Sequence, residues 1–384
     1  MKDSFTTTHK VLYNDSRDMS GIEPNTVNLI ITSPPYPMIK MWDDVFNSMN
    51  IDIGNELNIG KGERAFELMH QELDRVWDEC FRVLKNGGIM CINVGDATRT
   101  IKNNFQLYSN HSRILSYCLK KGFHNLPNII WRKTTNAPNK YMGSGMLPVG
   151  AYVTLEHEYI LIFRKGLKRE FKSQLEKSQR RKSAFFWEER NQWFSDIWFN
   201  MTGANQNLNN KELRERSGAF PFELAHRLIN MFSVYGDSVL DPFLGTGTTT
   251  IASIVNGRNS YGFEIDHNFQ TVIESWIIHS INLSKAVLKN RITQHLNFIN
   301  EREKEKEVKY YNSNYSFKCV SNQEKDLVFH QLLKITELDD NSFSAVLKEL
   351  LAEQMEEMLH QKIKHNIKNT QQKLKNNRNQ LNLI

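Results

Sequence analysis

The stretch DSVLDPFLGTGTTTIASIVNGRNSYGFEID, residues 237 to 266, decides the fold. It is typical of a strand, a glycine loop, a helix, a second strand and an acidic residue, in that order. Gly245 and Gly247 allow the backbone to turn sharply and to approach a ligand closely. Glu264 ends the second strand, close to the spacing at which an acid binds ribose hydroxyls in dinucleotide folds.

Two kinds of ligand compete for this loop. A nicotinamide dinucleotide has a pyrophosphate, and its fingerprint requires a third glycine, whereas this loop reads G-T-G-T-T. Two glycines and a ribose-binding acid suit a nucleoside without pyrophosphate, and S-adenosylmethionine is such a ligand. The preceding Asp241, Pro242 and Phe243 and the following Thr248 and Thr249 make the motif more specific than a lone GxG.

A second informative stretch is VNLIITSPPYPM, residues 27 to 38. A strand cannot continue through Pro34 and Pro35, because proline lacks the N–H group and fixes φ. The strand therefore ends there, and a stiff turn holds the Ser33 hydroxyl and the Tyr36 ring at its carboxyl end. Open α/β sheets bind their ligands at that end of the strands. An ordinary strand end with a rigid loop is the alternative interpretation.

The rest of the chain alternates strand and helix signals, which is typical of a parallel sheet flanked by helices. Strands are expected at residues 27–32, 88–94, 127–132, 158–164, 238–241 and 259–264. Helices are expected within residues 63–88, 220–236 and 249–258. After about residue 267 the pattern becomes long, charged and helical, and we expect a helical appendage there.

Composition limits the class of protein. The 384 residues allow one large or two medium domains. No apolar run is long enough to span a bilayer, and the N-terminus lacks a signal peptide, so a cytoplasmic protein is expected. The four cysteines, at positions 80, 91, 118 and 319, lack CxxC spacing, which favours reduced, buried thiols over zinc ligands or disulfides.

Two segments between the motifs have an unusual composition. The formal net charge of +6 is mild, but residues 166–183 hold seven basic and two acidic residues. A solvated helix face and a phosphate-contacting surface are both compatible with that segment. Residues 183–200 carry three Trp and four Phe, which favours core or a folded flap over part of a target-recognition region.

Together the motifs resemble those of the amino-methylating DNA methyltransferases of the permuted, β-type order. In that family S/D/N-P-P-Y comes first, and DPFxGxGTT comes near the end. Four further stretches resemble family strands and the helix before the cofactor strand: residues 82–96, 122–143, 155–166 and 216–232. The resemblance runs from about residue 10 to about residue 275.

The resemblance implies a Rossmann-like α/β sheet in circularly permuted order, with S-adenosylmethionine as cofactor and no metal. The methyltransferase domain would cover residues 1–275 and the helical appendage residues 276–384. Within that domain, the catalytic half, the target-recognition segment and the cofactor half would cover about 10–165, 166–215 and 216–275. The resemblance assigns catalysis to Ser33, Pro34, Pro35 and Tyr36, and cofactor binding to Asp241, Pro242, Phe243, Gly245, Gly247, Thr248, Glu264 and Phe220.

The substrate implied by the resemblance is an exocyclic amino group of a base in double-stranded DNA. Its lone pair is conjugated into the ring, so the enzyme must localise that lone pair and align it with the methyl group. The Ser33 hydroxyl and the Pro34 carbonyl can accept from the two amino hydrogens, and the Tyr36 ring can stack on an extruded base. Ring-carbon methylation needs a Pro-Cys nucleophile, and the sequence has no Pro-Cys pair.

Cytosine N4 is the expected target, because Ser in the first position of this family's motif goes mainly with cytosine. A neutral hydroxyl can also donate, for instance to N3 of a flipped cytosine. A cognate restriction endonuclease is the implied functional partner. The alternatives are an adenine-N6 enzyme, an enzyme acting on RNA or a protein amide, and a non-catalytic DNA-binding relative. Asp96 could line the pocket or cap a helix, and His157 is not expected in a catalytic triad.

Overall fold

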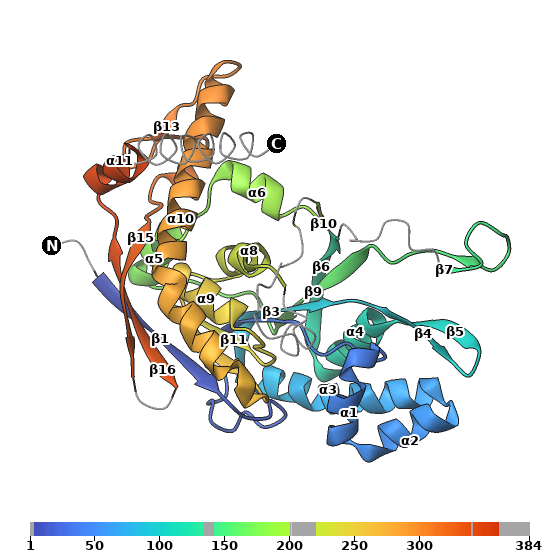
Figure 1. The fold of residues 1–384 in the computed structure, drawn as a ribbon. Coiled ribbons are helices and arrows are strands. Elements are labelled where there is room, and N and C mark those ends of the chain that lie inside the picture. The colour runs from blue at the N-terminus through green and yellow to red at the C-terminus, as the bar shows by residue number, and fades with distance from the viewer. Residues whose placement is uncertain (1–3, 134–141, 200, 202–219, 339–340, 361–384) are drawn as a thin grey trace, which may run out of the picture.

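A computed structural model describes residues 4–133, 142–199, 201, 220–338 and 341–360. Within these residues, ten strands form one sheet (Figure 1). Its order is β10 (Ile197–Trp198), β6 (Phe123–Arg132), β9 (His157–Lys165), β3 (Leu84–Val94), β2 (Val27–Thr32), β11 (Ser238–Asp241), β12 (Asn259–Phe263), β1 (Ser4–Leu12), β16 (Ser342–Glu349) and β15 (His330–Glu337).

The centre of the sheet is parallel. Strands β3, β2, β11, β12 and β1 run in the same direction, whereas β9 is antiparallel to both β3 and β6. All six residues of β2 are buried, as expected for a central strand covered on both faces, and its sequence is apolar except for Asn28 and Thr32. This α/β architecture with a large central sheet confirms the expected fold class, and the six predicted strands are all present.

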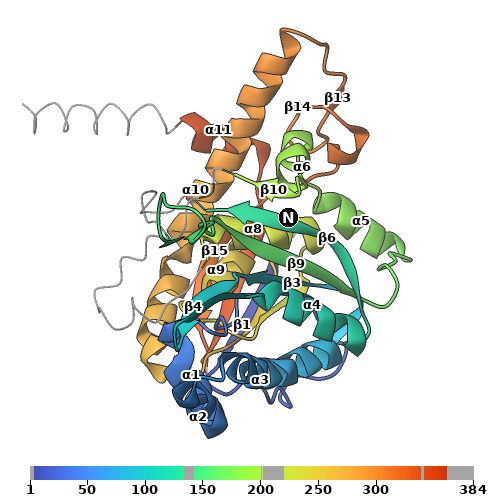
Figure 2. The ribbon, with the colours of Figure 1, turned by 90° about the vertical axis from the view of Figure 1, so that its right-hand side faces the viewer.

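Helices cover both faces of the sheet (Figure 2). On one face, α3 (Gly62–Val83) and α4 (Asn110–Lys121) pack on a core that includes Ile30 of β2. On the other face, α8 (Phe222–Phe232) and α9 (Thr248–Val255) pack near Leu29 and Ile31. This alternation along β2 follows from the two-residue repeat of a strand.

Smaller elements surround this core. On the side of α3 lie η1 (Lys40–Trp42), α1 (Asp43–Met49) and α2 (Ile51–Ile59). The hairpins β4 (Ala97–Ile101)–β5 (Asn104–Tyr108) and β7 (Met142–Gly143)–β8 (Ala151–Tyr152) project from the same side of the molecule (Figure 1). The remaining elements are α5 (Gln174–Lys182), α6 (Trp187–Trp193), η2 (His267–Phe269), α10 (Gln270–Glu303), β13 (Tyr310–Tyr311), β14 (Lys318–Cys319), η3 (Asn322–Glu324) and α11 (Ala352–His360).

The C-terminal part corrects one expectation. The helical prediction holds for α10, which runs through residue 275 without a break, but it is wrong for residues 330–349. There β16 pairs antiparallel with β1, and β15 pairs with β16, so both strands extend the central sheet. Alternate residues of β16, including Phe343 and Leu347, are buried against α10, and this pairing covers what would otherwise be the exposed edge of β1.

Other boundaries differ in smaller ways. The first predicted helix ends at Val83, because Gly87 and Gly88 belong to β3 and do not form a helix cap. Residues 361–384 of the predicted appendage and residues 134–141 of the predicted catalytic half lie outside the described residues. The division into catalytic, recognition and cofactor segments stays a prediction.

The expected burial of the cysteines is confirmed, since Cys80, Cys91, Cys118 and Cys319 are all buried, and all four are free. Among the described residues, we find no helix that combines the length and the apolar character needed to cross a membrane.

Candidate active site

The two sequence motifs lie side by side, at the carboxyl ends of two neighbouring central strands. Strands β2 and β11 are parallel neighbours, with Leu29 opposite Val239. Ser33 follows the carboxyl end of β2, and Asp241 is the last residue of β11. The Thr32 hydroxyl donates to Asp241 Oδ1 at 2.7 Å and so joins the two strand ends directly. The two motifs, more than 200 residues apart in the sequence, are therefore adjacent in the fold.

Asp241 connects β2, the glycine loop and α9. Its side chain is buried, and besides Thr32 it accepts hydrogen bonds from the Thr249 hydroxyl at 2.6 Å and the Phe243 N–H at 3.0 Å. Burial raises the pKa of Asp241 to about 6, although the three hydrogen bonds act in the opposite direction. Both carboxylate oxygens thus have protein partners, and Asp241 fixes the shape of the loop that follows it.

The glycine loop is left-handed at both glycines. Gly245 has φ 55° and Gly247 has φ 87°. A Cβ atom at Gly247 would lie 3.3 Å from Ile273 Cγ2 of α10, so this glycine permits close helix packing. A Cβ atom at Gly245 would meet no atom of the described residues within 4 Å. The open side of the loop is therefore at Gly245.

Glu264 lies next to that open side. Its Oε2 accepts from the Gly245 N–H at 2.7 Å, and its Oε1 accepts from the Asp266 N–H at 2.9 Å. Burial raises the pKa of Glu264 to about 7, against the effect of these two bonds. Each carboxylate oxygen has further acceptor capacity, so Glu264 can bind two adjacent hydroxyl groups. This arrangement fits a ribose-containing ligand without a pyrophosphate.

The other residues predicted to bind the cofactor occupy different positions. Pro242 is buried, and Thr248 is half-buried as the first residue of α9. Phe243 packs edge-on against Trp77, with ring centroids 6.1 Å apart. Phe220 precedes α8 and is buried in the apolar cluster between that helix and the sheet. Their contacts with a cofactor stay predictions.

The Ser-Pro-Pro-Tyr turn is held by polar contacts that the sequence alone did not suggest. The Tyr36 hydroxyl donates to Glu158 Oε2 at 3.1 Å and accepts from Asn93 Nδ2 at 3.0 Å. Ser33 Oγ lies 3.0 Å from the same hydroxyl. Burial raises the pKa of Tyr36 well above its ordinary value, so the phenol is neutral and can donate. Pro34 and Pro35, within the turn, are buried.

Sequence analysis missed Glu158, Asn93 and Lys133. Asn93 Nδ2 also donates to Glu158 Oε2 at 2.6 Å, and Lys133 Nζ pairs with Glu158 Oε1. Glu158 lies on β9 and Asn93 on β3, and the two strands are antiparallel neighbours. The sequence offered only an acidic residue at the start of a predicted strand, and its place at the carboxyl ends of the parallel strands depends on the pairing of β9 with β3. His157 packs edge-on against Tyr159, with ring centroids 4.9 Å apart.

Asn110 joins the chain after the Ser33–Tyr36 turn to the chain after β3. This buried residue donates from Nδ2 to the Pro37 carbonyl at 3.1 Å and to the Gly95 carbonyl at 3.0 Å. Asp96 accepts from the His111 N–H at 3.1 Å and from its ring at 2.8 Å, near the start of α4. Of the two interpretations of Asp96, the structure therefore favours the helix cap.

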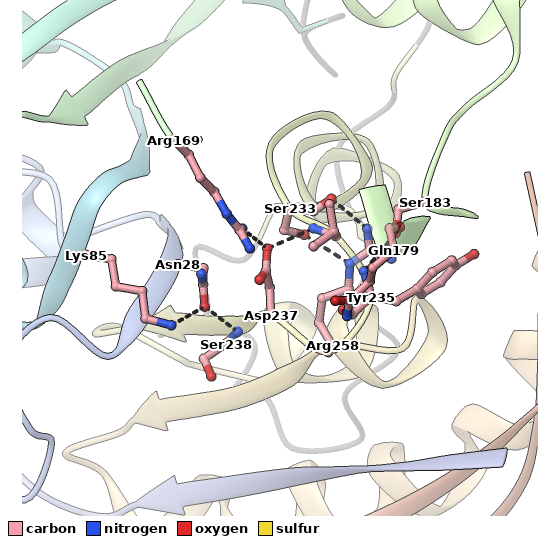
Figure 3. A network of polar contacts seen from close by, with 12 residues as sticks. Asn28, Lys85, Arg169, Gln179, Ser183, Ser233, Tyr235, Asp237, Ser238 and Arg258 are labelled. Atoms are coloured by element: carbon pink, nitrogen blue, oxygen red, sulfur yellow. Dashed lines mark hydrogen bonds and ion pairs between the residues drawn. The ribbon is translucent and has the colours of Figure 1, made fainter. Parts of the chain in front are cut away.

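The basic segment 166–183 contacts the opposite edge of the sheet. It follows β9 at the end remote from Glu158, and Arg169 pairs with Asp237 Oδ2 at 2.6 Å (Figure 3). Asp237 lies directly before β11, at the amino end of the strand that Asp241 ends. The Tyr235 N–H donates to the Ser183 hydroxyl at 3.0 Å, which docks the end of the segment to the same loop. Arg169 thus has an internal partner.

The aromatic run 183–200 is divided between core and surface, since Phe194 and Phe199 are exposed. Phe186, Trp193 and Trp198 are buried. Glu189 of α6 pairs with Arg291 of α10, with Arg291 Nη2 2.8 Å from Glu189 Oε2. These contacts confirm the core interpretation for the three buried rings. Residues 202–215 of the predicted target-recognition segment lie outside the part of the chain described here.

Comparison with known proteins agrees with this geometry. A family model described as DNA methylase matches residues 27–275. The type II methyltransferase M.MthZI of Methanothermobacter thermautotrophicus is 50% identical over 345 residues, which cover 90% of this chain and 96% of that protein. The type II methyltransferase M.MjaI of Methanocaldococcus jannaschii is 49% identical over 288 residues, covering 72% and 93%. The Thermus thermophilus protein TTHA0409, solved in complex with S-adenosyl-L-methionine, shows 32% identity and a TM-score of 0.55 over 71% of this chain and 95% of that one.

Proposed function

This chain belongs to the DNA methylase family, and we propose that it transfers a methyl group from S-adenosylmethionine to the N4 amino group of a cytosine in double-stranded DNA. The observation that carries the proposal is the contact between the Ser33 turn and the glycine loop, joined by Thr32 and Asp241. That contact brings a set of hydrogen-bond acceptors next to a ribose-binding carboxylate. The order of the two motifs along the chain supports the permuted, β-type arrangement.

S-adenosylmethionine is the cofactor, and its donor methyl group is already activated by the sulfonium. Gly245 and Glu264 would hold its ribose end, because the space beside Gly245 is open and Glu264 has acceptor capacity left. Thr248, at the first position of α9, would contribute a hydroxyl at the helix N-terminus.

The protein's part in catalysis is to orient the amino group. Ser33 Oγ and the Pro34 carbonyl would each accept one amino hydrogen, which directs the nitrogen lone pair toward the methyl group. A proline at position 35 has no N–H that could form a competing bond next to that carbonyl. No covalent enzyme–base intermediate is required.

The target base must leave the duplex to reach these groups. Extrusion costs a few kcal/mol, and stacking on an aromatic ring returns roughly 1–3 kcal/mol. We assign this stacking to Tyr36, whose ring is half-buried beside Gly95. A Cβ atom at Gly95 would lie 3.0 Å from Tyr36 Cε2, so the absence of a side chain there allows the ring its position.

The biological role follows from the relatives. M.MthZI and M.MjaI are named as type II methyltransferases, the modification enzymes of restriction systems. By analogy, we assign this protein to the modification half of such a system, protecting a short DNA site from a cognate endonuclease. The choice of cytosine over adenine rests on the Ser in the first position of the Ser33–Tyr36 turn.

A methyl-transfer assay tests the proposal. Wild-type protein should move a labelled methyl group from S-adenosylmethionine to duplex DNA without added metal. Tyr36→Ala should abolish transfer but keep cofactor affinity, and Tyr311→Ala, at an exposed tyrosine, should behave as wild type. If wild-type protein labels no DNA that contains diverse short sites, the proposed activity is wrong.

A further inference from the structure

The Tyr36 hydroxyl is the centre of a polar network at the end of β2. Besides the backbone N–H of Gly95, three side chains surround it: Glu158 Oε2 at 3.1 Å, Asn93 Nδ2 at 3.0 Å and Ser33 Oγ at 3.0 Å. They come from β9, β3 and the turn itself, so three chain segments converge on one oxygen atom. A phenolic hydroxyl has one hydrogen to donate, and its oxygen can accept.

The chemistry of the partners fixes the direction of each bond. A carboxylate only accepts, so the Tyr36 hydrogen must go to Glu158. The amide nitrogen of Asn93 and the Gly95 N–H can only donate, so the Tyr36 oxygen accepts from both. Tyr36 therefore has no hydrogen left to donate to Ser33, so the Ser33 hydroxyl is the donor in the contact between them.

Glu158 is surrounded by donors that hold it in this role. Lys133 Nζ pairs with Oε1, and Asn93 Nδ2 donates to Oε2 at 2.6 Å. Lys133 in turn lies 4.6 Å over the Trp131 ring. Both oxygens of the Glu158 carboxylate therefore have donors, which restrict the orientation of the side chain.

We propose that Glu158 is a positioning residue that acts through Tyr36 to make Ser33 Oγ a pure hydrogen-bond acceptor toward the substrate amino group. This inference rests on the proposed methyl transfer and deepens it. With its hydrogen committed to Tyr36, Ser33 turns only lone pairs outward, as an amino-group substrate requires. The same commitment prevents Ser33 from donating to N3 of a flipped cytosine, so that donation does not explain base choice.

Two substitutions test the chain of contacts. Tyr36→Phe keeps the stacking ring but removes the oxygen that receives the Ser33 hydrogen. Glu158→Gln replaces a pure acceptor by a group that can also donate, so the Tyr36 hydrogen no longer has one possible direction. Each should lower kcat roughly 5- to 30-fold, the effect of one lost substrate hydrogen bond, without weakening S-adenosylmethionine binding. Glu156→Gln, two residues away in an exposed pair with Arg132, is the matched control.

The decisive measurement is a double-mutant cycle on single-turnover methyl transfer. In a Ser33→Ala background there is no hydroxyl to orient, so Glu158→Gln and Tyr36→Phe should cause no further loss. The positioning role would be overturned if Glu158→Gln and Tyr36→Phe lowered the rate by the same factor with and without the Ser33 hydroxyl. It would also be overturned if Tyr36→Phe kept the wild-type kcat. If Glu158→Gln misfolds by circular dichroism, the Tyr36→Phe and Ser33→Ala cycle still decides the question. Absence of transfer by the wild-type protein would instead refute the proposed function itself.

Discussion

Thr32→Val tests the contact that holds the two motifs together. Valine has nearly the shape of threonine, so the substitution removes the hydroxyl that donates to Asp241 Oδ1 at 2.7 Å and little else. Thr32 is fully buried and Asp241 is only 2% exposed, so water cannot replace the lost donor. A hydrogen bond to a charged group contributes about 1.5–3 kcal/mol, and we expect the free energy of unfolding to fall by that amount.

The loss should depend on pH in a defined direction. Burial already raises the pKa of Asp241 to about 6, and removing a donor raises that pKa further. A carboxyl group whose pKa is raised on folding contributes stability that is present at low pH and lost as pH rises through the folded pKa. The cost of Thr32→Val should therefore be largest above pH 7 and should shrink below pH 6, where Asp241 is protonated in both proteins.

The assay is urea unfolding of the ligand-free protein at pH 8 and pH 5.5. Thr250→Val is the matched control, because Thr250 is also fully buried and its hydroxyl has no hydrogen-bond partner among the described residues. We expect the control to be as stable as wild type or more stable, since it removes an unpaired buried hydroxyl. Equal losses in the two variants, or a loss from Thr32→Val that grows at low pH, would refute the reasoning.

Three further predictions concern the cofactor loop and the C-terminal strands. Gly245→Asn should weaken S-adenosylmethionine binding roughly tenfold or more in calorimetry, because Asn tolerates the left-handed φ and its side chain fills the open space beside residue 245. Gly236→Asn, at another left-handed glycine, is the control and should leave the binding affinity unchanged. The affinity for S-adenosylmethionine should fall as the pH drops below about 7, because Glu264 becomes protonated there. Protonation of Glu264 should in contrast make the ligand-free protein more stable as the pH falls from about 7 toward 4.5. Glu264→Gln should abolish both trends. Phe343→Ala should lower the free energy of unfolding of the whole protein by about 3–5 kcal/mol, and a separate transition for the C-terminal part would contradict this.

The placement of Ser33 and Gly245 at the same end of the sheet could be predicted from sequence, because both motifs end a strand with a strong local signal. Two prolines after β2 and two glycines after β11 mark the carboxyl ends of these strands, and such ends share one edge of a parallel sheet. That β2 and β11 are neighbours does not follow from these local signals, because the two strand ends are 209 residues apart in sequence; the family resemblance implied it.

Glu158 could not be found in this way. It is 122 residues from Tyr36 and lies on an antiparallel strand, so its position depends on the register of β9 against β3. No local pattern specifies that register. Strand β16 was missed for a related reason: its polar and charged residues, such as Lys348, resemble a solvated helix, and only its pairing with β1 reveals the buried alternate face.

The most direct test of the central claim is to identify the methylated nucleoside. Duplex DNA incubated with the wild-type protein and S-adenosylmethionine, then digested to nucleosides and separated by mass and retention, should contain N4-methylcytosine. N6-methyladenine would contradict the base assignment but keep the Ser33–Tyr36 mechanism, because both substrates are conjugated exocyclic amines. 5-Methylcytosine would contradict the account, since the sequence has no Pro-Cys nucleophile to attack the cytosine ring.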